Sequence, residues 1–358
     1  MSNLILPEDV FTDFASQNDK EWSGIVNAKE KTKSVIESIK IAITHDSIPL
    51  SLTDSDLVIF GSIARKECTE KSDIDWTLLI DAAGSSAPNN IAYSIGEQLE
   101  RKDLIKPGSS GMFGQITYSH EIINFIGGQD DTNHNMTRRM LMLLESTKTN
   151  PNGIEDSFSA YERVCRAIID QYIKHDSSYL AHRIGKKKFP RYLLNDVIRF
   201  WRTMCVDFAY KQKEQGGNKW ALRNIKLRMS RKLIFIKGLL MCFECYQNKD
   251  LNEIETREKL EKAIEIPALD YVIKVFIENN ISKADIIRFI DLYNEFINLL
   301  DNPVFREELK CLEMDKAYET PTFKDAKQNC DEFQKVFDKI FIYDQSEIQK
   351  FTLKYGIF

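Results

Sequence analysis

Residues 57–81, which read LVIFGSIARKECTEKSDIDWTLLID, constrain the fold more than any other stretch of this chain. The apolar run at residues 57–60 predicts a buried strand that ends at Gly61, where a glycine and a serine interrupt the apolar pattern. A helical turn and a polar connector then lead to the Ser-Asp-Ile-Asp sequence at residues 72–75. A second apolar run at residues 76–80 predicts another strand. Polar groups are therefore concentrated between two buried strands.

Asp73 and Asp75 are two residues apart, and side chains at this spacing in a strand point to the same face. The spacing predicts two adjacent carboxylates, with Ile74 and Trp76 turned to the opposite face. Carboxylates this close repel each other unless a cation lies between them, and hard oxygen ligands suit Mg²⁺. The Gly-Ser turn can offer backbone N–H groups and a hydroxyl to a phosphate. Together these features predict a site for a nucleoside triphosphate with Mg²⁺, or with Mn²⁺ in its place.

The pattern G-S-x-A-R, six residues, then S-D-x-D resembles the signature of the DNA polymerase β-like nucleotidyltransferase superfamily. The residues that fall on its positions are Gly61, Ser62, Arg65, Ser72, Asp73 and Asp75. One departure is Lys66, which stands where many members have a small residue. The resemblance implies that Asp73 and Asp75 are catalytic metal ligands. It also implies that Gly61, Ser62, Arg65 and Ser72 bind the nucleotide.

Members of this superfamily usually take a third carboxylate from a later strand. The resemblance therefore points to Glu121 as a further catalytic metal ligand, because it stands in the apolar, strand-like sequence His-Glu-Ile-Ile. Asp130 and Asp131 are the alternatives. The segment at residues 127–146 allows two interpretations. It can be a capped and buried helix, or it can bring Asp131, Asn133 and Arg138 to the nucleotide, as in the bacterial branch near PII-uridylyltransferase-like enzymes.

The stretch TKTNPNGIED at residues 147–156 is the best candidate for a domain boundary. We predict an α+β fold: residues 1–150 form a nucleotidyltransferase domain with a small mixed β-sheet, and residues 151–358 form an α-helical domain that closes the nucleotide cleft. Helical domains of related enzymes supply Ser, Lys and Arg groups to the triphosphate. By this resemblance the candidates here are Ser230, Arg231 and Lys232, followed by Arg199 and Arg202.

Charge distribution supports an anionic ligand at one place more than a nucleic-acid-binding protein as a whole. The formal net charge is −5, yet residues 183–237 contain sixteen Lys and Arg against three Asp and Glu, a local charge of +13. Seven scattered cysteines predict reduced thiols in a cytoplasmic protein. Cys242 and Cys245 form a lone CxxC pair, which we expect to be buried and free of zinc. The sequence shows no secretory signal, and we expect no membrane span.

The predicted reaction transfers a nucleoside monophosphate from an NTP or dNTP to a hydroxyl group and releases pyrophosphate. The acceptor stays open among a protein side chain, a nucleic-acid 3′ end or short oligonucleotide, and another nucleotide. The last two acceptors would make the chain a terminal transferase or an oligonucleotide-synthesising enzyme of anti-phage defence. An effector or partner protein is a further expected partner. The alternative is a catalytically silent nucleotide-binding or antitoxin-like partner protein, which the intact Asp73 and Asp75 pair disfavours.

Overall fold

The computed structural model describes residues 9–43, 54–82, 87–102, 112–149, 159–174, 189–214, 217, 219–248 and 251–356. The chain forms two compact units, each assembled from separate segments. The first, which we call the sheet unit, comprises Lys29–Tyr192 and Asn248–Pro267. The second, the helical unit, comprises Met1–Ala28, Leu193–Gln247 and Ala268–Phe358.

This division differs from the predicted one at residue 150, because later segments join the sheet unit. The helix α7 (Ala160–Lys174) packs against the sheet, and α12 (Glu253–Glu265) packs against α7. Ion pairs connect these two helices: Arg166 Nε lies 2.6 Å from Glu261, and Arg257 Nη1 lies 3.2 Å from Asp170. Residues 150–156 of the predicted boundary lie outside the described residues.

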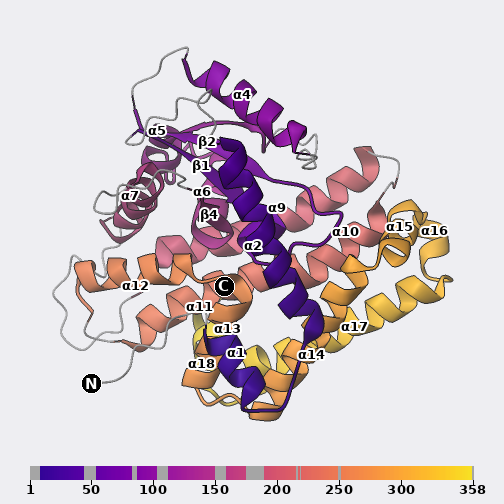
Figure 1. The fold of residues 1–358 in the computed structure, drawn as a ribbon. Helices are drawn as coiled ribbons and strands as arrows, with labels where there is room; N and C mark the ends of the chain where they lie inside the picture. Colours follow the sequence, from indigo (N-terminus) through magenta and orange to yellow (C-terminus); the bar gives the residue numbers. More distant parts are fainter. Residues whose placement is uncertain are drawn as a thin grey trace. The chain divides into compact units, whose positions relative to one another are not determined.

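Among the described residues the sheet has four strands in the order β3-β2-β1-β4. Figure 1 labels β1, β2 and β4. Their bounds are β1 (Ser55–Phe60), β2 (Trp76–Ile80), β3 (Gln115–Tyr118) and β4 (Ser146–Lys148). The central strand β1 runs antiparallel to both β2 and β4, whereas β2 and β3 are parallel. A mostly helical chain with this small mixed sheet confirms the predicted α+β class.

The strand β1 is buried along its whole length, because both of its faces are covered. Leu57 and Ile59 belong to a core that also includes Trp76 and Leu78 of β2 and Ile95 of α4. The opposite face packs against α7. Burial on both faces explains why residues 57–60 of β1 are continuously apolar and do not alternate. The remaining helices of this unit are α2 (Ser23–Ile43, from residue 29), α3 (Gly61–Ala64), α4 (Ala87–Arg101), α5 (Ser119–Asn124) and α6 (Asn133–Leu144).

The sequence around Glu121 forms a helix, and the predicted strand at this place is wrong. The strand β3 ends at Tyr118, and α5 begins at the next residue. A short apolar run cannot be assigned to a strand or a helix from periodicity alone. Only Ile122 of this run is fully buried, and Glu121 occupies the first turn, where carboxylates are favoured by the helix dipole.

The helical unit has a core rich in aromatic side chains, with Phe289 close to both Phe276 and Phe333. Close to the C-terminus, Phe351 is buried against the ring of Tyr246 of the same unit. Helices and π-helical segments of this unit are α1 (Asp9–Ser16), α9 (Arg191–Glu214), α10 (Trp220–Lys226), η1 (Leu227–Arg231), α11 (Lys232–Gln247), α13 (Ala268–Glu278), α14 (Lys283–Asp301), α15 (Pro303–Cys311), α16 (Met314–Ala317), α17 (Pro321–Asp338), η2 (Lys339–Tyr343), α18 (Glu347–Phe351) and η3 (Thr352–Gly356).

The seven cysteines are free thiols, and Cys242 and Cys245 are buried as predicted. Burial raises the pKa of the Cys242 thiol, which disfavours the thiolate that binds metals. The described helices include none that is both long enough and apolar enough to cross a bilayer.

A buried carboxylate joins β1 to α7. Asp56 is 6% exposed, and its carboxylate accepts a 2.7 Å hydrogen bond from the backbone N–H of Tyr161 in the first turn of α7. Burial raises the pKa of Asp56, while this hydrogen bond, a side-chain hydrogen bond with Ser159 and the charge of Lys148 oppose the shift. The ionised carboxylate is therefore held at the helix start at some cost in solvation.

The raised pKa of Asp56 predicts a pH dependence of stability. The folded protein retains this proton above the pKa of the unfolded state, so Asp56 destabilises the fold progressively as pH rises from about 4 through the folded pKa. Asp56→Asn keeps an acceptor for Tyr161 but does not titrate. We expect the stability of this variant relative to wild type to increase between pH 4 and pH 7 in urea unfolding. A constant difference, or one of opposite sign, would contradict this assignment.

Candidate functional site

The turn after β1 brings a backbone and a carboxylate into unusually close contact. The N–H of Phe60 donates a 2.7 Å hydrogen bond to the carbonyl oxygen of Asp75, which holds the end of β1 against the residue before β2. Gly61 follows with φ +69°, in the left-handed region that favours glycine. A Cβ atom built on Gly61 would lie 2.7 Å from Oδ2 of Asp75. The glycine is thus required by both its φ angle and the adjacent carboxylate.

The segment before β2 separates polar from apolar side chains in the predicted way. Ile74 and Trp76 are each 3% exposed and belong to the core of the sheet unit. Asp73 and Asp75 are only partly buried. The hydroxyl-bearing residue Ser62 is also partly buried, in the turn that Gly61 begins. Carboxylates and a turn therefore lie together at one end of β1, where solvent and ligands can reach them.

Ser72 participates in the connector between α3 and β2. Its Oγ accepts a 2.9 Å hydrogen bond from the N–H of Thr69 and lies 3.1 Å from the Thr69 hydroxyl. The connector is also held by a 2.7 Å hydrogen bond from the N–H of Glu67 to the carbonyl of Ser62. These contacts give Ser72 a structural task in closing the loop that delivers Asp73 and Asp75.

Arg65 lies in a buried cluster with two carboxylates. Its Nε is 2.7 Å from Oε2 of Glu67, and its Nη1 pairs with Glu145. The side chains of Arg65, Glu67 and Glu145 are 8%, 6% and 0% exposed. Glu145 directly precedes β4, whose first residue, Ser146, pairs with Phe60. This cluster connects the turn at Gly61 to the edge strand, so the guanidinium that we predicted to bind nucleotide is engaged by protein carboxylates.

The three predicted metal ligands do not form one group. Among the described residues, which include Asp73, Asp75 and Glu121, no cluster of three or more His, Cys, Asp or Glu side chains is arranged to hold a metal ion. Glu121 belongs to α5, its side chain is 48% exposed, and Nη1 of Arg138 lies 4.0 Å from its carboxylate. Asp73 and Asp75 remain the candidate metal ligands, and a third carboxylate is not identified.

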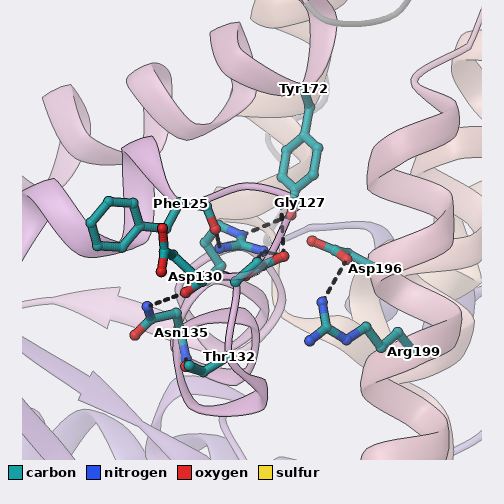
Figure 2. Close-up of polar contacts among 10 residues, drawn as sticks. Phe125, Gly127, Asp130, Thr132, Asn135, Tyr172, Asp196 and Arg199 are labelled. Carbon is teal, nitrogen blue, oxygen red and sulfur yellow. Dashed lines mark hydrogen bonds and ion pairs between the residues drawn. The ribbon is translucent and has the colours of Figure 1, made fainter.

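The helix α6 is capped and buried, as the first of our two interpretations expected. Thr132 Oγ1 accepts a hydrogen bond from the N–H of Asn135, and residues 139–144 are buried. Arg139 is fully buried and donates to both oxygens of Asp131, to the hydroxyl of Tyr172 and to the carbonyl of Phe125 (Figure 2). Asp131 is thereby an internal counterion for Arg139. Our second interpretation assigned it to the nucleotide.

The helical unit gives the predicted triphosphate ligands internal contacts. Ser230 is 2% exposed, and its hydroxyl donates to the carbonyl of Lys226 within a π-helical segment. The ammonium group of Lys232 pairs with Gln334 and lies 5.7 Å from the centre of the Phe337 ring. Burial lowers the pKa of Lys232, and it lowers the pKa of Lys237 to about 7. Lys232 and Lys237 are therefore inside the unit, so the exposed charge of residues 183–237 is smaller than the +13 counted from the sequence.

The other predicted cations differ in exposure. Arg231 is partly buried, as is Arg199, whose Nη1 lies 3.9 Å from a carboxylate oxygen of Asp196 (Figure 2). Arg202 is exposed on α9. Of the residues that we predicted in this unit, Arg202 is the most accessible cation.

Sequence reasoning missed Glu67 and Glu145, the two carboxylates that engage Arg65. Glu67 is two residues beyond Arg65, but a polar connector rich in charge gives no sign of which carboxylate is buried. Glu145 follows the strongly apolar run MLMLL, and a single acid at the end of such a run was the available signal. Comparison with known proteins gives no relative for this arrangement: no family model matches the chain, and no curated protein matches it significantly.

The close contact at Gly61 predicts a large effect of a single methyl group. Gly61→Ala places a side chain in the left-handed region and drives its Cβ against Asp75, so we expect a loss of about 2–3 kcal/mol in the free energy of unfolding. The matched control is Gly128→Ala, which shares a positive φ, +85°, but has no atom within 4 Å of the new Cβ. Equal losses in both variants, measured by urea unfolding, would show that the contact with Asp75 adds no constraint.

The buried cluster predicts a second difference in stability. Glu145→Gln removes one of the two carboxylates that compensate Arg65, and removing a partner from a buried ion pair costs about 3–5 kcal/mol. Glu70→Gln is the control, because Glu70 is an exposed carboxylate in the same connector, 4.0 Å from Lys31, and we expect no measurable change. If thermal and urea unfolding find Glu145→Gln as stable as the control, the cluster does not hold the turn.

Proposed function

We propose that the sheet unit is the catalytic part of a nucleotidyltransferase that requires a divalent cation. The observation that supports this proposal most directly is the placement of the Asp75 carboxylate against the backbone of Gly61. A carboxylate that binds a metal and a turn that binds phosphate must be adjacent if both are to act on one metal–triphosphate complex. The absence of a side chain at Gly61 lets the Asp75 carboxylate lie directly against this turn, as such adjacency requires.

Asp73 and Asp75 have the chemistry that Mg²⁺ prefers, since both are carboxylates and both are partly accessible. When bound, the cation neutralises phosphate charge and polarises the reacting oxygen atoms. The backbone of Gly61 and the hydroxyl of Ser62 orient the triphosphate chain. A hydroxyl of the acceptor attacks the α-phosphorus, the bond to the β-phosphate oxygen breaks, and pyrophosphate leaves. The protein contributes mainly positioning and electrostatic stabilisation.

The acceptor is a hydroxyl of a nucleic acid, a nucleotide or a protein, and one class within this proposal is an enzyme that makes oligonucleotides in anti-phage defence. The structure modifies the assignment of residues in this proposal. Arg65 and Ser72 act by holding the loop, whereas Asp73, Asp75, Gly61 and Ser62 contact the substrate.

A second candidate function is a nucleotide-binding partner protein without catalytic activity. The observation that favours it is that no third carboxylate joins Asp73 and Asp75 among the described residues. Two carboxylates are sufficient to bind a metal–nucleotide complex, but a complete catalytic set in the related superfamily usually has three. The two functions therefore differ in turnover and not in nucleotide binding.

The test is product analysis with purified protein, Mg²⁺ or Mn²⁺, and each NTP and dNTP labelled at the α-phosphate. For the enzyme we expect labelled product together with pyrophosphate, and a loss of at least about 10³-fold in the Asp73→Ala/Asp75→Ala variant. The variant Asp54→Ala, outside the proposed site, is the control. Label in a ladder or small product identifies a nucleotide acceptor, and label on the chain identifies a protein acceptor.

The binding-partner function predicts the opposite pair of results. A nucleotide with Mg²⁺ would raise the melting temperature of the wild type, but no labelled product would form with any nucleotide. If neither thermal stabilisation nor product is found with any nucleotide, both functions are rejected.

A further inference from the structure

Two consecutive arginines of α6 have very different surroundings. Arg139 is fully buried, and every nitrogen of its guanidinium donates a hydrogen bond to Asp131, Tyr172 or Phe125. Arg138 is also largely buried, with a side chain 12% exposed, yet its Nε has no hydrogen-bond partner among the described residues. Its ion-pair contact, to Glu121, is at the 4.0 Å limit. The fold compensates one guanidinium and leaves its neighbour largely uncompensated.

The uncompensated charge has a physical cost. A buried guanidinium that lacks acceptors loses its hydration without replacing it, and buried polar groups in native proteins normally have partners. Burial lowers the pKa of Arg138, and Glu121 opposes this effect only in part. A cation retained under these conditions is a candidate for binding an anion that supplies the missing acceptors from solution.

The surroundings of Arg138 favour an anion over a cation. His134 lies one helical turn before Arg138, on the same face of α6, and is exposed. Partial burial and the positive charge of Arg138 lower the pKa of His134, which places the two groups in electrostatic contact. The first turn of α6 contains no acidic residue. Glu121 is the one carboxylate in electrostatic contact with both groups among the described residues.

We propose that Arg138, with His134 beside it, forms a binding site for a phosphate-class oxyanion on the sheet unit, and that Glu121 is the competing internal carboxylate that the oxyanion displaces. The planar guanidinium offers paired donors that match phosphate oxygens. Glu121 is suited to displacement because it is half exposed and its contact with Arg138 is long. The role assigned to Glu121 here is to regulate access to Arg138. It replaces the metal-binding role that the sequence predicted.

The experiment is a calorimetric titration of the full-length protein with inorganic pyrophosphate at pH 7.5, without added metal. Four proteins are compared: wild type, Arg138→Gln, Glu121→Gln and Arg163→Gln. The last is a matched control, since Arg163 is a partly exposed arginine of the same unit that pairs with Asp81. Far-UV circular dichroism verifies that each variant is folded.

The proposal predicts changes of opposite sign. Arg138→Gln should weaken pyrophosphate binding by about tenfold or more, because it removes the charged donor. Glu121→Gln should strengthen binding several-fold, because it removes the competitor, and Arg163→Gln should bind as wild type. Unchanged pyrophosphate binding in Arg138→Gln would overturn the proposal. So would the absence of detectable binding to wild type at pyrophosphate concentrations up to about 20 mM.

Glu121→Gln keeps the test decisive if Arg138→Gln does not fold, because the side chain of Glu121 is half exposed and its replacement does not open the core. Weaker or equal binding in Glu121→Gln contradicts displacement.

The source of the anion is found by repeating the wild-type titration with Mg²⁺ and a saturating non-hydrolysable nucleotide. Loss of pyrophosphate binding identifies the phosphates of the nucleotide as the ligand, and retained binding identifies a separate phosphate. Both results keep the site at Arg138, and neither requires the chain to be a nucleotidyltransferase.

Discussion

The hydrogen bond from Phe60 to the carbonyl of Asp75 fixes the point at which the candidate site is built. Directly after this bond the chain leaves β1 in a left-handed conformation at Gly61, where the Asp75 carboxylate occupies the space that a side chain would need. From that point the connector must return to β2 within a short span, and the contacts of Arg65, Glu67 and Ser72 satisfy this requirement. The contacts of the residues around the two aspartates therefore fix the position of the aspartates within the protein.

Arginine has three distinct roles in the sheet unit, and the balance of acceptors separates them. Arg139 has a complete set of acceptors and joins α6 to α7. Arg65 is shared by two buried carboxylates and joins the turn to β4. Arg138 has one long ion-pair contact, to Glu121, and is the one of these three for which we propose an external anion. Residue type and sequence position distinguish none of these roles, because two of the three arginines are adjacent in the chain.

The secondary structure that positions the site could be predicted from sequence where the physics is local. Apolar runs define β1 and β2, and the i, i+2 spacing separates Asp73 and Asp75 from Ile74 and Trp76. What could not be predicted depends on contacts between distant residues. The pairing of Arg65 with Glu145 joins residues eighty positions apart, and the helical conformation around Glu121 is decided by where β3 ends. The same limit applies to Ser230 and Lys232. Their polarity and charge suggested exposure, but Ser230 donates a hydrogen bond within its own helix and Lys232 packs against α17.

The interleaving of segments between the two units has a consequence for synthesis on the ribosome. The sheet unit includes α12, so its last segment emerges only after α9, α10 and α11, which belong to the other unit, have already been made. Those three helices must wait for residues 268–358 before the remainder of their own unit is available. Apolar faces of α11 are thus exposed on the nascent chain for at least the time needed to translate about a hundred residues, roughly 5–20 seconds. A chain of this design depends on the order of its segments as much as on their sequences, and a cut between residues 192 and 193 would leave neither unit whole.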